Sequence, residues 1–247
     1  MPDHDRSGAA ELNFLAQLAE PTGRRKFLKF AGFTIAVSAV ACRADGVTQP
    51  ARASGDQHDA AVSLGTGDVA VLNYAYALEQ LEAAFYTQVV AAPYAGITPE
   101  ELAILTDIKR HEVIHREFLK QALGAAAIPG LAVDFTSVDF TQRTTGAENG
   151  VLDLAKVFED IGVSAYNGAG KLLTNVDYLV VAGKIVSVEA RHAAAIRDLL
   201  NPKSRDFAGD DVVDAQGLDI VREPAEVLPL ADPFVVNAID ASGLPTA

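Results

Sequence analysis

The chain has 247 residues, 49% of them apolar, which is enough to bury the core of one domain with flanking segments. It carries 33 acidic and 20 basic residues, and no basic stripe follows the first thirty positions. Nucleic-acid binding needs a surface that neutralises phosphates, so this composition excludes nucleic acid as a partner. The single cysteine, Cys42, excludes an intrachain disulfide, a thiolate zinc site and an iron–sulfur cluster within one chain.

Residues 1–42 have the pattern of an export signal. A basic cluster precedes an apolar run from Phe30 to Ala41, and this run is too short to cross a bilayer. The segment that starts with Arg24 and Arg25, RRKFLK, resembles the twin-arginine export motif, with Gly23 where Ser or Thr is more usual. We therefore expect export by the twin-arginine pathway to the periplasm or cell envelope.

The end of this segment allows two interpretations. Cleavage after Ala41 would leave Cys42 as the new N-terminus, where a bacterial lipoprotein carries its lipid. Ala39, however, stands where lipoprotein signals prefer Leu, Val or Ile, and the Ala39-Val40-Ala41 pattern also suits ordinary signal peptidase. A lipid anchor on Cys42 and release without lipid both stay open. Residues 43–66 contain too few large apolar side chains to pack, so we predict a flexible tether.

Four helices are predicted in the next segment, which we treat as one bundle domain over residues 67–200. Apolar residues recur at helical spacing over residues 69–90, 99–123, 150–174 and 177–200, although three glycines weaken the third helix. Thr98 is a suitable N-cap for the second helix, and Asn201-Pro202 ends the fourth. Residues 124–149 make a long connection between the second and third helices, and residues 201–247 are predicted to be an extended arm packed on the bundle. Such a crossover favours an all-α, ferritin-like four-helix bundle over a simple up-and-down one.

One spacing of polar residues occurs twice in these helices. In each half a Glu is followed by a Tyr seven residues later, and a Glu-x-x-His motif follows on the next helix. The first copy comprises Glu79, Tyr86, Glu112 and His115, and the second comprises Glu159, Tyr166, Glu189 and His192. Two matched copies are a much more specific signal than a single Glu-x-x-His, because helices are rich in Glu.

The helical repeat explains why these residues could form one site. At 100° per residue, seven steps return to within about 20° of the start, and three steps place Glu and His one turn apart on one face. Apolar residues flank all of these positions, so the polar groups should point inward. Four carboxylates and two imidazoles buried without partners would each cost several kcal/mol, and two divalent cations would remove that cost. The six predicted ligands are Glu79, Glu112, His115, Glu159, Glu189 and His192.

The chemistry of the six predicted ligands limits which metal ions fit the site. One Glu from each of two helices plus one Glu-x-x-His from each of the other two is the arrangement of ferritin-like di-iron and di-manganese proteins. Mixed carboxylate and imidazole ligation suits iron or manganese better than magnesium, while zinc stays open. We therefore predict two iron ions, with manganese as the alternative.

Neighbouring polar residues have less specific roles. We expect Tyr86 and Tyr166 to hydrogen-bond a ligand carboxylate of the opposite half, although tyrosine also occurs as simple core packing. Glu82 lies one turn from Glu79 and competes with it, but the repeated spacing selects Glu79 as the ligand. His111 points about 100° away from Glu112, which favours a surface or supporting role over ligation.

The segments LNYAYALEQLEAAFY, RHEVIHREFL, FEDIGVSAY and VEARHAAAIRDLL resemble the exported bacterial ferritin-like proteins that are similar to plant desiccation-related proteins. The resemblance covers roughly residues 68–200. It implies a ferritin-like bundle and a di-iron site in the family's six ligand positions, all of which are filled here.

Two functions are compatible with these observations. The first is an exported redox protein whose two iron ions react with dioxygen or peroxide, as a ferroxidase or peroxidase-like protein in stress protection, with a manganese catalase-like activity as a variant. The alternative is a non-catalytic structural or desiccation-stress protein that the metal stabilises. A storage cage is disfavoured, because the tether and the arm would both interfere with the contacts of a shell.

Overall fold

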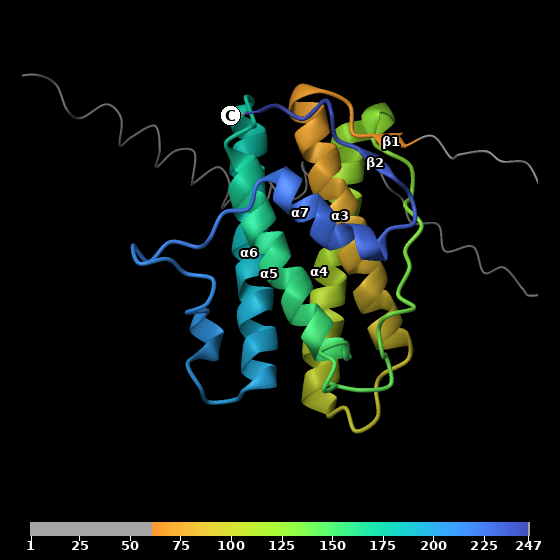
Figure 1. Cartoon of the computed structure of the whole chain (residues 1–247), viewed down its shortest axis with the longest axis vertical. Helices are drawn as coiled ribbons and strands as arrows, with labels where there is room; N and C mark the ends of the chain where they lie inside the picture. The colour runs from red at the N-terminus through yellow and green to blue at the C-terminus, as the bar shows by residue number, and fades with distance from the viewer. Residues whose placement is uncertain (1–60, 247) are drawn as a thin grey trace, which may run out of the picture. The chain divides into compact units, whose positions relative to one another are not determined.

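The computed structural model describes residues 61–246, and the predicted signal residues Arg24, Arg25 and Cys42 lie outside them. Four long helices form a bundle in this part of the chain (Figure 1), which confirms the predicted all-α fold. They are α3 (Gly67–Ala91), α4 (Pro99–Leu123), α5 (Val151–Gly170) and α6 (Val176–Leu200). Within residues 61–246, none of the helices combines the length and the hydropathy that a membrane span requires.

The connection between α4 and α5 sets the topology. The helices pack most closely as two pairs, α3 with α4 and α5 with α6, and each pair is antiparallel (Figure 1). Residues 127–150, drawn in green, return along the bundle, so α5 starts at the same end as α4 and runs parallel to it (Figure 1). This is the crossover predicted from the sequence, and it brings the middle of all four helices to one level.

Local capping sets where α4 begins. The Thr98 hydroxyl accepts a hydrogen bond from the Glu101 amide at 3.1 Å, and the Glu101 carboxylate accepts one from the Thr98 amide at 3.1 Å. This reciprocal capping satisfies two amides that the first turn leaves free, and Pro99 at the first helical position needs no such partner. The prediction of residues 99–123 is therefore confirmed at both ends.

The third helix is shorter than predicted, because α5 ends at Gly170 rather than Thr174. The amides of Leu172 and Leu173 bond carbonyls three residues back, which tightens the chain into a turn. The Asp68 carboxylate, at the start of α3, then accepts hydrogen bonds from the amides of Thr174 and Asn175 at 2.8 and 2.9 Å. A contact from a distant helix thus fixes the α5–α6 turn.

Buried amide side chains of α3 hold the crossover in place. The Asn73 amide group donates to the Ala126 carbonyl at 2.8 Å, and its oxygen accepts from the Ile128 amide at 3.0 Å. Two turns further along α3, the Gln80 side-chain oxygen accepts a hydrogen bond from the Leu131 amide at 2.8 Å. These bonds satisfy the backbone of a segment that has almost no regular structure.

The last residues of the predicted tether belong to the fold. Strand β1 (Val62–Ser63) pairs in parallel with β2 (Ile239–Asp240), and the Leu64 side chain is fully buried. The prediction of a tether that reaches residue 66 is therefore wrong for its last residues, because their partner is a strand far away in the sequence.

The chain after α6, predicted to be extended, contains an eight-residue helix, α7 (Pro224–Ala231), and the short turns η2 (Asp206–Ala208) and η3 (Asp232–Phe234). Its backbone lies directly on α5, where the Arg222 amide donates to the Ser164 carbonyl at 3.1 Å. A Cβ atom on Gly168 would lie only 1.9 Å from the Arg222 carbonyl oxygen. Glycine at this position permits the close approach.

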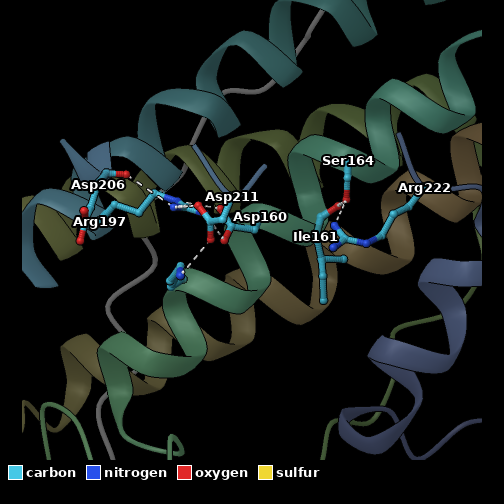
Figure 2. Close-up of polar contacts among 8 residues, drawn as sticks. Asp160, Ile161, Ser164, Arg197, Asp206, Asp211 and Arg222 are labelled. Atoms are coloured by element: carbon cyan, nitrogen blue, oxygen red, sulfur yellow. Dashed lines mark hydrogen bonds and ion pairs between the residues drawn. The ribbon is translucent and has the colours of Figure 1, made fainter. Parts of the chain in front are cut away.

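Arg197 ties the same arm to the bundle (Figure 2). This buried guanidinium on α6 donates to Asp160 of α5 at 2.7 Å and to Asp211 of the arm at 2.5 Å. Arg197 holds the pKa of Asp211 at about 2, whereas burial raises the pKa of Asp160 above its ordinary value. Three segments distant in sequence therefore meet at one buried charge.

Candidate metal centre

The six predicted ligand residues meet in the middle of the bundle. Each of the four helices contributes one glutamate with no exposed surface, and α4 and α6 each add a histidine one turn further along. These residues are Glu79 from α3, Glu112 and His115 from α4, Glu159 from α5, and Glu189 and His192 from α6. Because apolar residues flank them on every helix, the amphipathic pattern that buries the core also turns these side chains inward.

Their ligand atoms form two overlapping groups, in each of which all atoms lie within 4.8 Å of one another. The first group comprises Glu79, Glu112, His115 and Glu189, and the second comprises Glu112, Glu159, Glu189 and His192. Glu112 and Glu189 belong to both groups. These two carboxylates could therefore help to hold a metal ion in either group.

The first group converges on His115. Its Nδ1 atom lies 2.9 Å from Oε1 of Glu189 and 3.4 Å from Oε2 of both Glu79 and Glu112. Three carboxylates therefore approach one ring nitrogen from three different helices.

The second group has the matching geometry around His192. Its Nδ1 atom lies 2.7 Å from Oε1 of Glu112, 3.4 Å from Oε2 of Glu159 and 3.6 Å from Oε2 of Glu189. The twofold repeat in the sequence is thus a twofold repeat in space, with one imidazole on each side of the two shared carboxylates.

These atoms suit metal ligation better than hydrogen bonding to one another. Eight buried atoms of the six residues have no partner with hydrogen-bond geometry among the described residues, although they lie within a few ångströms of each other. The eight are Oε2 of Glu79, both oxygens of Glu112, Nδ1 of His115, Oε2 of Glu159, both oxygens of Glu189 and Nδ1 of His192. Leaving such groups unpaired is costly, and atoms that all face a shared point are what a cation requires. The residues present therefore fit two divalent ions.

The electrostatics of the cluster lead to the same conclusion. Burial, together with the charge of Glu189, raises the pKa of Glu79 well above its ordinary value, and burial raises the pKa of Glu159 to about 8. Burial alone lowers the pKa of both imidazoles, but the surrounding carboxylates raise the pKa of His115 and of His192 to about 12. Without metal the cluster therefore retains protons, which bound cations would displace.

Two tyrosines hold ligand carboxylates across the bundle. The Tyr86 hydroxyl donates to Oε1 of Glu159 at 2.5 Å, and the Tyr166 hydroxyl donates to Oε1 of Glu79 at 2.5 Å. Each tyrosine serves the opposite half, as expected from the sequence. The second oxygen of each carboxylate remains free to face the centre.

Glu82 lies beside the site, and sequence reasoning treated it only as a competitor of Glu79. Both side chains are buried, with Glu82 4% exposed, but Glu82 is not part of either metal group. A Cβ atom on Gly162 would lie 3.0 Å from Oε1 of Glu82 and 3.7 Å from Oε2 of Glu189. Gly162 occupies the position in the second half that Glu82 occupies in the first, three residues after the repeated Glu. The Glu82 carboxylate of the first half thus fills the space that Gly162 leaves in the second half. Comparing the residues three positions after the repeated Glu in the two halves would have revealed this pair from the sequence.

His111 supports a ligand from outside. Its Nδ1 atom lies 2.9 Å from Nε2 of His192, and the two rings stack with an interplanar angle of 9°. Because Nδ1 of His192 faces the carboxylates, His111 contacts the nitrogen that points away from them. Such a contact fixes the orientation of a ligating imidazole.

Comparison with known proteins agrees with the fold and the site. A family model described as a ferritin-like domain matches residues 67–202, which is more than half of the chain and includes all six clustered residues. A search of curated proteins found none that matches the sequence. The helical bundle, its crossover and the matched family model together show that the chain belongs to the ferritin-like domain family.

Proposed function

We propose that this chain is an exported di-metal carboxylate protein of the cell envelope, in which two iron ions react with dioxygen or peroxide. The observation that carries the proposal is the set of eight buried ligand atoms without hydrogen-bond partners in the described part of the chain. One ion would be held by Glu79 and His115 and the other by Glu159 and His192. Glu112 and Glu189 would contact both ions.

Iron bound in this way would supply one-electron redox chemistry towards small oxidants. The protein's own contribution is to orient the ligands and to exclude water. Tyr86 and Tyr166 fix two of the carboxylates, and His111 fixes the ring of His192. Ferrous iron and peroxide are the substrates that this reasoning favours, in a ferroxidase or peroxidase-like reaction that protects against oxidative stress. Manganese at the same ligands would suit disproportionation of peroxide.

The proposal of export rests on the Arg24-Arg25 segment and its apolar run. A lipid on Cys42 would anchor the protein to a membrane, and cleavage by ordinary signal peptidase would release it. Mass spectrometry of the mature N-terminus distinguishes the two outcomes.

The first experiment measures metal content in protein purified without chelators. We expect about two iron or manganese ions per chain, as in other sites with this ligand set. Glu159→Ala and His192→Ala should lose metal, while Glu117→Ala, at a partly exposed position on the same helix as Glu112, should keep it. Absence of metal from the wild-type protein, with stability unchanged in the variants, would refute the proposed site.

The second experiment measures consumption of ferrous iron and of peroxide by the metal-loaded protein. Wild-type protein should consume at least one of them faster than the Glu159→Ala variant does. Metal binding with no such difference would favour the alternative, a non-catalytic protein that the metal stabilises.

A further inference from the structure

A largely apolar cavity lies at one end of the bundle, next to the metal centre. Its volume is about 200 Å³, and it is enclosed by the N-terminal halves of α3 and α6 and the C-terminal halves of α4 and α5. Its inner wall consists of apolar side chains that are themselves buried, among them Val71, Leu78, Leu119, Ala165 and Ala169. None of the ligand residues described above lines this cavity.

On three of the helices the cavity has a lining residue one helical turn from a ligand. Ala75 lies four residues before Glu79, and Ile185 lies four residues before Glu189. Leu119 lies four residues after His115. Residues four apart on a helix lie on the same face, so the faces that present ligands to the centre also line this cavity.

The ring of Tyr166 is part of the wall. Tyr166 lines the cavity, and its hydroxyl donates to the Glu79 carboxylate at 2.5 Å. A molecule in the cavity would therefore contact the ring of a residue that is hydrogen-bonded to Glu79, one of the six predicted metal-binding residues.

The mouth lies between α4 and α6, which are in looser contact with each other than either is with its own partner helix. The partly exposed lining residues belong mainly to these two helices and include Phe118, Tyr178, Val181 and Ala182. The only charged lining residue is the exposed Asp177, which would repel an anion at this opening. The charge pattern therefore favours an uncharged ligand.

We propose that this cavity binds an uncharged aliphatic molecule of medium chain length, for which 1-hexanol is a soluble probe. A cavity of about 150 Å³ with a similar lining accommodates benzene, so this one has room for a chain of about six to eight carbon atoms. The bound chain lies against the ring of Tyr166, one turn from the centre. The inference does not depend on the proposed redox function, because binding is measured without turnover.

The test is calorimetric titration of the purified protein with 1-hexanol and with hexanoate, which have the same carbon chain length. We expect saturable 1:1 binding of hexanol and binding of hexanoate at least tenfold weaker. Ala182→Phe, which places a large ring at the mouth, should weaken hexanol binding at least tenfold. Ala195→Phe, on the same helix and also partly exposed but away from the cavity, is the matched control and should bind as the wild type does.

Absence of saturable hexanol binding to the wild-type protein would overturn the proposal. So would equal weakening in Ala182→Phe and Ala195→Phe, or equal affinity for hexanol and hexanoate. Circular dichroism of each variant shows whether it is folded, and Val181→Phe replaces Ala182→Phe at the mouth if the latter fails to fold. Metal content and consumption of peroxide are separate measurements, so failure of the proposed function remains distinguishable from failure of this one.

Discussion

Removing and restoring the metal should change the stability of the bundle by a calculable amount. Two groups of ligand atoms share Glu112 and Glu189, so two ions are expected. An ion present at a hundred times its dissociation constant stabilises the folded chain by about 2.7 kcal/mol, and two ions therefore by about 5.4 kcal/mol. One kcal/mol shifts the melting temperature of a domain of this size by about 2–4 °C, so the total shift should be about 11–22 °C.

Two glutamate variants should lose different fractions of this shift in melting temperature, because the two residues belong to different numbers of ligand groups. Glu112 belongs to both groups, so Glu112→Gln should abolish most of the metal-induced shift, whereas Glu159 belongs to one group and Glu159→Gln should retain about half. Either substitution also changes the stability of the metal-free protein, because each glutamate lies beside the ring of His192. The informative quantity is therefore the difference between melts with and without metal.

Differential scanning calorimetry with ferrous, manganous and zinc ions under anaerobic conditions measures this difference. Glu117→Gln, at a partly exposed position on α4, should shift as the wild type does. Identical melting of the wild-type protein with and without metal would refute the reasoning, as would a full shift in Glu112→Gln.

Three further substitutions test individual contacts. Tyr86→Phe removes the 2.5 Å hydrogen bond to Glu159 and should weaken metal affinity about 10- to 100-fold. A competition titration with a chelator measures this affinity, and an unchanged value would argue against a role for the tyrosine in orienting Glu159. Gly168→Ala would place a methyl group 1.9 Å from the Arg222 carbonyl, so urea denaturation should show a loss of about 1–3 kcal/mol, while Gly183→Ala, which meets nothing within 4 Å, should lose no stability. Arg197→Met leaves the Asp160 carboxylate buried without its partner and should cost about 3–5 kcal/mol in the same assay, a loss that the double variant with Asp160→Leu should largely recover if the unpaired charge is its cause.

The sequence predicts the parts of this fold that depend on local periodicity. The ends of α4 follow from Thr98, Pro99 and Gly124, and the inward direction of the glutamates follows from the apolar residues four positions away. The pairing of two half-sites follows from the repeated spacing, because the crossover makes both halves use the same helix geometry.

Other features depend on residues far apart in the chain and escape such reasoning. The turn between α5 and α6 is held by Asp68 of another helix, and Leu64 is buried because a strand near residue 239 covers the start of the fold. The burial of Glu82 depends on Gly162, which leaves room for it only when the two halves pack together. The helical periodicity around Glu82 or around Gly162 does not by itself reveal that Glu82 is buried.

The pairing of β1 with β2 places the start of the described chain beside a segment close to its end. Val62 lies beside Ile239, and a Cβ atom on Gly243 would lie 1.9 Å from the Gly65 carbonyl oxygen. Because this pairing is parallel, the chain continues past Ile239 in the same direction as past Val62, so a linker that runs back from residue 246 to residue 61 would close the chain into a ring. Opening that ring in the loop at residues 92–98 gives a circular permutant that begins with α4 and keeps every ligand-bearing helix intact. The metal centre should form equally well in either order of the helices, because it depends on where they meet and not on which comes first.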